Sequence, residues 1–142
     1  MKEVLKECIC AKDIEFALLF GSFVTGEQHQ LSDIDIGVYF KKEPDLMQVL
    51  ALVDELEQRV QRRVDLVVLN ALYTKHPLLA YEITLNHKAI CILNYELYAE
   101  FQAKSYLYYF DLKPLYQMQI EAFKERIEHG NIAKTAQTRT KS

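Results

Sequence analysis

Two aspartates separated by one residue, Asp33 and Asp35, are the side chains of this sequence best suited to chemistry. They open an apolar stretch, residues 34–40, that we predict to be a β-strand. Residues i and i+2 of a strand project from the same face, with Cα atoms about 6.5–7 Å apart. Two carboxylates so placed can share one divalent cation or flank two, as phosphoryl-transfer sites require. Acidic pairs at strand ends are also common without metal, so the pair alone does not decide.

A third carboxylate, Asp65, stands near the start of another apolar stretch, residues 64–69. A predicted helix over residues 45–62 connects the two strands, so they can lie side by side in one sheet. Three neighbouring carboxylates repel one another unless a cation lies between them, and the cluster therefore predicts a metal site. The structural alternative is an acid at a turn that pairs with Arg62 or Arg63.

A Gly-Ser pair, Gly21 and Ser22, follows the apolar stretch 15–20, and ten residues separate it from Asp33. Glycine has no Cβ and lets the backbone approach a phosphate closely. Ser22 offers a hydroxyl at the predicted start of a helical turn over residues 22–26, where free amides favour anions. An ordinary turn with an N-cap serine would have the same sequence, so this motif alone leaves both readings open.

The elements that must position these residues alternate between strands and helices, which predicts an α/β fold. We expect a small mixed sheet that carries the acids, backed by helices, with a helical C-terminal part. The expected organisation is one domain over residues 1–130, with a core over 1–93 and a helical part over 94–130, followed by a flexible tail over 131–142. The expected strands are 15–20, 34–40, 64–69 and 88–93; the expected helices are 2–11, 45–62, 78–85, 95–110 and 115–129, with a break at 111–114. The helix over 45–62 is the most periodic, with one predicted apolar stripe formed by Leu46, Val49, Leu50, Val53, Leu56 and Val60.

The composition is that of one globular domain. Of 142 residues, 50% are hydrophobic and 26% are charged, which excludes a wholly disordered chain. The net charge is −3; residues 1–70 carry 8 Lys/Arg and 13 Asp/Glu, whereas residues 71–142 carry 9 and 7. The acidic half that holds the aspartates would need cations, such as Mg²⁺, to face an anionic substrate. There is no strong basic patch for direct nucleic-acid binding, and no apolar run of 18 residues for a membrane span.

Three cysteines, Cys8, Cys10 and Cys91, lie in apolar surroundings. Their odd number predicts reduced, buried thiols, as in a cytosolic protein. The N-terminus has no charged-then-apolar signal segment. We therefore expect a cytoplasmic location.

The full arrangement is a Gly-Ser pair, ten residues, Asp33-Ile34-Asp35, a helix, and a strand with a third aspartate. It resembles the nucleotidyltransferase superfamily typified by DNA polymerase beta. The motif resemblance covers residues 15–70, and residues 71–130 are similar more loosely, as the helical trailing part of that family. The short chain resembles the minimal nucleotidyltransferases, small prokaryotic proteins often encoded beside a HEPN-domain ribonuclease toxin.

The resemblance implies an ATP- and Mg²⁺-dependent transfer of AMP, with two Mg²⁺ ions expected and pyrophosphate as the leaving group. In the toxin–antitoxin pairs of this family, the acceptor is a tyrosine of the HEPN partner, and AMP transfer silences the ribonuclease. The third acid would also help to deprotonate the attacking hydroxyl. The implied nucleotide-binding residues are Gly21, Ser22 and Ser32, and the implied metal-binding and catalytic residues are Asp33, Asp35 and Asp65.

One position departs from the family pattern. The family often has an arginine before the second glycine, in a Gly-Ser-x-Ala-Arg-Gly motif, whereas this chain has Thr25 there. The phosphate-facing cation is then missing, or it comes from Lys41, Lys42 or Lys75.

We therefore predict a Mg²⁺-dependent nucleotidyltransferase that moves AMP from ATP to a hydroxyl of a HEPN toxin and serves as its antitoxin in a hetero-oligomer. Two alternatives stay open. One is a drug- or nucleic-acid-modifying transferase, which would usually need an added binding domain. The other is a non-catalytic antitoxin that neutralises its partner by binding alone, for which Thr25 is the supporting feature.

Overall fold

The computed structural model describes residues 2–26 and 33–128. The chain divides into two compact units, residues 1–107 and residues from 108 onward. The single domain over residues 1–130 stays a prediction, and the predicted tail over 131–142 lies outside the described residues. The elements are α1 (Lys2–Ile9), β1 (Ile14–Phe20), α2 (Ser22–Thr25), β2 (Ile34–Phe40), α3 (Leu46–Val60), β3 (Val64–Val68), α4 (Leu72–Lys75), α5 (Pro77–Leu85), β4 (His87–Ile92) and α6 (Tyr95–Glu128).

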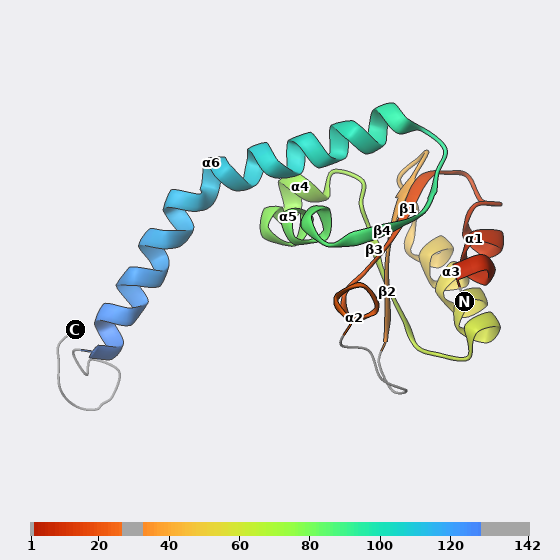
Figure 1. Ribbon diagram of the computed structural model, residues 1–142, viewed down its shortest axis with the longest axis horizontal. Helices are drawn as coiled ribbons and strands as arrows, with labels where there is room; N and C mark the ends of the chain where they lie inside the picture. The colour runs from red at the N-terminus through yellow and green to blue at the C-terminus, as the bar shows by residue number, and fades with distance from the viewer. Residues whose placement is uncertain (1, 27–32, 129–142) are drawn as a thin grey trace. The chain divides into compact units, whose positions relative to one another are not determined.

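The strands form one mixed sheet in the order β3-β2-β1-β4 (Figure 1). Strand β1 runs antiparallel to both β2 and β4, whereas β2 and β3 are parallel. The parallel pair requires a crossover, and α3 provides it between β2 and β3. The predicted α/β fold with a small mixed sheet is therefore confirmed.

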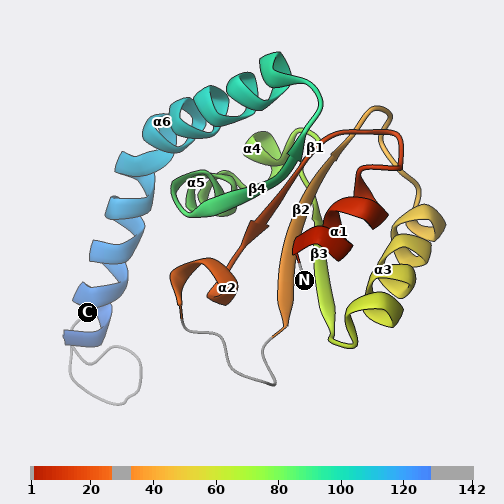
Figure 2. The same ribbon diagram turned by 45° about the vertical axis from the view of Figure 1, so that its right-hand side comes forward.

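Helices cover the sheet on both faces, and the alternation of β2 decides which side chains meet which helices (Figure 2). Ile34, Ile36 and Val38 are fully buried in a core that includes residues of α1 and α3. On the opposite face, Tyr39 packs against a second core built from α4, α5 and the start of α6. Asp35 shares the face of Tyr39 because the two are four residues apart on one strand. The acids therefore lie on the α4–α5 side of the sheet.

The predicted apolar stripe of α3 is only partly right. Leu46 and Leu50 are 70% and 51% exposed, whereas Leu52, which lies outside the predicted stripe, is 5% exposed. Leu46 and Leu50 lie about 120° and 160° around the helix from Leu52, so they point away from the face that is buried. The apolar residues of α3 therefore cover a wider arc than the core, and the sequence pattern does not show which part of that arc is buried.

The predicted break at residues 111–114 is wrong, because α6 continues through Pro114. A proline inside a helix loses one backbone hydrogen bond and crowds the preceding turn, at a cost of about 3 kcal/mol. Good helix formers flank Pro114 on both sides, so the two expected helices form one. The described part of the second unit is the continuation of this helix.

The predicted reduced state is wrong for two of the three cysteines. Cys10 and Cys91 form a disulfide with Cα atoms 6.5 Å apart, which joins the end of α1 to β4. Cys8 is free and buried as expected, and its thiol donates to Glu55 Oε2 at 3.1 Å. Burial and the neighbouring Glu55 raise the pKa of the Cys8 thiol. Within the described ranges, no helix has the length and apolar character needed to cross a membrane.

Candidate active site

Strand pairing brings the predicted acids to neighbouring positions of the sheet. Asp35 of β2 pairs directly with Asp65 of β3, and on its other side Asp35 pairs with Phe20 of β1. Neighbouring strands lie about 4.8 Å apart, so the two carboxylates start from adjacent backbone positions on one face. The predicted adjacency of these strands is confirmed. Asp33 lies directly before β2, and the Ile34 N–H donates to the Arg63 carbonyl at 2.9 Å, which fixes the start of β2 against the loop before β3.

The electrostatics of Asp35 reflect this crowding. Asp35 is half-buried, whereas Asp33 and Asp65 are exposed. Burial raises the pKa of the Asp35 carboxyl, and the negative charges of Asp65 and Asp33 raise it further. Among the ion pairs identified in the described residues, none joins Asp65 to Arg62 or Arg63.

The three acids carry the type of ligand atom that a divalent cation needs, but their side chains do not surround a single metal position. Over residues 2–26 and 33–128, no three or more His, Cys, Asp or Glu side chains come close enough together to hold a metal ion. The negative charges of Asp65 and Asp33 nevertheless raise the pKa of the Asp35 carboxyl, so the three carboxylates lie close enough to repel one another. Carboxylate oxygens are the ligands that Mg²⁺ prefers, and a bound cation would relieve this repulsion.

The Gly-Ser turn touches the acids directly. Gly21 has φ 77° and ψ −149°, a backbone conformation that residues with a side chain rarely adopt. A Cβ built on Gly21 would collide with Asp35 Oδ2 and would lie 2.8 Å from Asp35 Cγ. Glycine is therefore required here both by its backbone and by the carboxylate beside it. Gly21 and Asp35, one from each predicted half of the motif, therefore lie side by side at the end of the sheet where β1 finishes and β2 begins.

The short helix α2 begins differently from the prediction. Its N-cap is Gly21, and Ser22, predicted to be the cap, is its first helical residue. The positive φ of Gly21 makes the turn out of β1, so the helix starts one residue later than a serine cap would place it. Gly26 ends the helix in the left-handed conformation, φ 85°, as predicted. Ser32, the remaining predicted nucleotide-binding residue, lies outside the described residues.

The cations proposed from the sequence to replace the missing arginine lie at the wrong end of the sheet. Lys41 and Lys42 follow β2, six and seven residues beyond Asp35, which is about 20 Å along an extended strand. Lys75 pairs with Glu43 at 3.5 Å, near that same end. None of these three lysines is placed to meet a phosphate at Gly21.

Arg62 is the cation that the sequence reasoning missed. Its guanidinium carbon lies 5.2 Å from the centroid of the Phe23 ring, in α2. Phe23 and Val24 pack against the core on the α1–α3 side of the sheet. Arg62 therefore stacks on the helical turn that follows Gly21 and helps to fix its position. Arg62 lies three residues before Asp65, and the sequence suggests only that acid as its partner.

His87 lies in the same row of paired residues, opposite Phe20 on β4, and has a structural role. Its Nδ1 lies 2.9 Å from the Ile83 carbonyl, and its Nε2 lies 2.7 Å from the Tyr98 hydroxyl. With the proton on Nδ1, the ring donates to the carbonyl and accepts from the tyrosine. Both nitrogens are thereby occupied in joining α5, β4 and α6.

Comparison with known proteins finds related sequences. Residues 2–96 match the family model described as "Polymerase beta, Nucleotidyltransferase". A protein of Methanocaldococcus jannaschii, named "Putative protein adenylyltransferase", is 41% identical over 71 residues, which are 50% of this chain and 79% of that protein. The protein adenylyltransferase MntA of Thermococcus cleftensis is 38% identical over 71 residues, 50% of this chain and 69% of that protein.

Solved structures share the fold. A toxin–antitoxin crystal structure with AMP-PNP contains a chain that superimposes with a TM-score of 0.76 and 23% identity, covering 87% of this chain and 98% of that one. The complex of tri-AMPylated Shewanella oneidensis HEPN toxin with MNT antitoxin gives a TM-score of 0.68 and 21% identity, covering 87% and 99%. At these identities the likeness establishes a common fold.

Proposed function

The chain belongs to the polymerase beta nucleotidyltransferase family, and on that premise we propose that it transfers AMP from ATP to a hydroxyl of a HEPN-type toxin and acts as the antitoxin. The observation that carries the proposal is the contact between the Gly21 turn and Asp35, with Asp65 paired to Asp35 in the sheet. Relatives named as protein adenylyltransferases support AMP as the group transferred. Similar folds seen with AMP-PNP and with an AMPylated HEPN toxin support ATP and this class of partner.

We assign the phosphate half of the site to Gly21 and Ser22. The missing Cβ of Gly21 leaves the backbone open to close approach, and the Ser22 hydroxyl is not used as the cap of α2. Ser32, which precedes Asp33, completes the proposed nucleotide-binding set. Arg62 acts as a positioning residue because it stacks on Phe23 and holds the turn in place.

We assign the metal half to Asp33, Asp35 and Asp65, which would hold Mg²⁺, with two ions expected. When bound, Mg²⁺ would neutralise charge on the phosphate oxygens as the leaving group departs. Asp35 is the half-buried member and touches the Gly21 turn, so it links the metal half to the phosphate half.

The proposed reaction is an in-line displacement at the α-phosphorus of ATP. The acceptor oxygen forms a bond to that phosphorus, the bond from the α-phosphorus to the bridging oxygen breaks, and pyrophosphate leaves. Asp65 accepts the hydroxyl proton. Asp65 is exposed on β3, an edge strand of the sheet, where a hydroxyl carried on another protein can reach it. This exposure favours a protein acceptor.

The test is transfer of label from [α-³²P]ATP to the HEPN protein encoded beside this chain, with and without Mg²⁺. We expect labelled toxin and loss of its ribonuclease activity, and a toxin with its acceptor tyrosine changed to phenylalanine should stay unlabelled. Asp33→Asn/Asp35→Asn should reduce transfer by at least about a thousandfold. Asp54→Asn, an exposed acid of α3, controls for the loss of charge.

Two results would contradict the proposal. The first is a wild-type protein that transfers no label, and the second is undiminished transfer by the double variant. If the double variant still neutralises the toxin without labelling it, the antitoxin acts by binding alone.

A further inference from the structure

The edge of the sheet formed by β4 is open, and it is the edge opposite β3, the strand that carries Asp65. Strand β4 is the last in the order β3-β2-β1-β4, and in the described sheet it pairs only with β1. An edge strand presents backbone N–H and C=O groups that can pair with another extended chain. The β4 edge can therefore accept a further strand.

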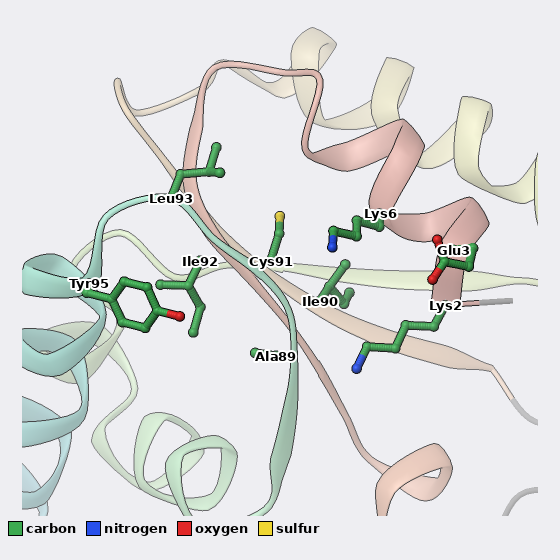
Figure 3. Close-up of a pocket in the computed structure, with 9 residues that line it drawn as sticks. All are labelled: Lys2, Glu3, Lys6, Ala89, Ile90, Cys91, Ile92, Leu93 and Tyr95. Carbon is green, nitrogen blue, oxygen red and sulfur yellow. The ribbon is translucent and has the colours of Figure 1, made fainter.

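A groove lies against this edge. Its volume is 540 Å³, within the range of about 300–1,000 Å³ typical of ligand sites. It is lined by residues 89–93, by Tyr95 and by the first residues of α1, namely Lys2, Glu3 and Lys6. Figure 3 shows the side chains of Lys2 and Lys6 extending from α1 toward β4. The groove therefore combines an open strand edge with two cationic side chains.

The charged side chains that line the groove indicate which kind of segment can bind there. In the described chain neither Lys2 nor Lys6 forms an ion pair, and Glu3 is the only acid of the lining. The chain's own last residues, 129–142, contain lysine and arginine but no acidic residue, so charge disfavours them as the occupant. A second copy would bring the same lysines against these. An acidic segment of another protein is the complementary partner.

The spacing of the lysines sharpens this choice. Lys2 and Lys6 are four residues apart on a helix, which is about 6 Å along its axis. Acidic residues at i and i+2 of an extended peptide project from one face about 6.5–7 Å apart. One such pair can reach both ammonium groups while its backbone runs along β4.

We propose that this groove binds an extended acidic segment of a partner protein, with an acid-x-acid pattern, as a fifth strand alongside β4. Backbone hydrogen bonds to residues 89–93 supply the pairing, and Lys2 and Lys6 select the acids. About five to six residues of peptide match this length of strand. The groove is lined by residues of α1 and β4 and by Tyr95, whereas Asp35 and Asp65 lie on β2 and β3, so binding requires neither ATP nor the acids.

The test uses a fluorescein-labelled six-residue peptide of alternating Glu and Val, titrated by anisotropy against the full chain without ATP. We expect saturable binding that weakens with added salt, and amide chemical-shift changes centred on residues 89–93. A peptide with N-methyl groups on alternate backbone amides, or with Lys in place of Glu, should not bind. Lys2→Glu/Lys6→Glu should weaken binding about tenfold or more, whereas the matched Lys41→Glu/Lys42→Glu should change it less than about twofold.

Three results would overturn the proposal. They are no saturable binding up to about 1 mM peptide, binding that survives N-methylation, and shift changes outside β4 and α1. A dimer formed through the β4 edge in the absence of peptide would instead identify a second copy as the occupant. AMP transfer by both double variants serves only as a check on folding, so failure of the transferase proposal would leave this test intact.

Discussion

Replacing Asp35 by asparagine should make the metal-free protein more stable while abolishing AMP transfer. Asp35 is half-buried, and Asp65 stands directly opposite it on the neighbouring strand. Like charges at paired strand positions destabilise a sheet by about 0.2–1 kcal/mol. Asparagine keeps the shape beside Gly21 and removes the charge. For a chain of this size, about 1 kcal/mol corresponds to about 3–4 °C, so we expect the melting temperature to rise by about 1–4 °C.

The gain in stability from Asp35→Asn should depend on pH. The pKa of the Asp35 carboxyl is raised above its ordinary value of 3.8 by burial, and further by the charges of Asp65 and Asp33. Between the unfolded and the folded pKa, the folded state keeps a proton that the unfolded chain has lost. Wild-type stability therefore falls as pH rises through that window and stays lower above it. The advantage of the asparagine variant should be present at neutral pH and vanish below the ordinary pKa.

Thermal unfolding in EDTA, followed by circular dichroism at several pH values, measures this difference. Asp54→Asn controls for the loss of one exposed negative charge. With Mg²⁺ present, the wild type should have a higher melting temperature than Asp35→Asn. A ligand at one hundred times its Kd stabilises the protein that binds it by about 2.7 kcal/mol. A lower melting temperature of Asp35→Asn in EDTA at neutral pH would refute the reasoning. So would an equal rise in the control.

Three further predictions follow from the same contacts. Gly21→Ala should abolish AMP transfer, because the alanine Cβ collides with the Asp35 carboxylate and a positive φ costs alanine about 1–2 kcal/mol. A folded variant with wild-type turnover would contradict this prediction. Arg62→Ala should raise KM for ATP about two- to fivefold with kcat retained, and Arg62→Lys should restore a KM close to that of the wild type. An equal loss of kcat in both variants would argue against a positioning role. Reducing the Cys10–Cys91 bond, which spans 81 residues, should lower the free energy of unfolding by up to about 4 kcal/mol; an unchanged urea midpoint in dithiothreitol would show that the bond contributes nothing.

The sequence predicted the strands and the adjacency of the acids because both follow from short-range patterns. An apolar run bounded by glycine identifies β1, and strict alternation identifies β2. The helix between β2 and β3 then implies a parallel pair, which is what sets Asp65 beside Asp35. Each step depends on residues close together in the chain.

Two of the errors concern pairings between distant segments, whereas the predicted break at residues 111–114 is a local error. Cys10 meets Cys91 because α1 ends beside the edge strand, and no spacing rule contains that distance. Leu46 and Leu50 are exposed because they lie about 120° and 160° around α3 from the buried Leu52. The sequence suggests the nearby Asp65 as the partner of Arg62, whereas its aromatic partner, Phe23, lies in α2, 39 positions earlier in the chain.

Gly21 shows why the two half-sites cannot be separated. From sequence, a missing Cβ is a way for the backbone to approach a phosphate. In the fold, the space that a Cβ would occupy is already taken by the Asp35 carboxylate. The pairing of Phe20 with Asp35 brings them together, so the distance between Gly21 and Asp35 is set by the register of β1 on β2. A one-residue slip would turn Asp35 to the other face of the sheet and break the contact with Gly21 in the same step. The register of β1 on β2 therefore decides whether Gly21 and Asp35 meet.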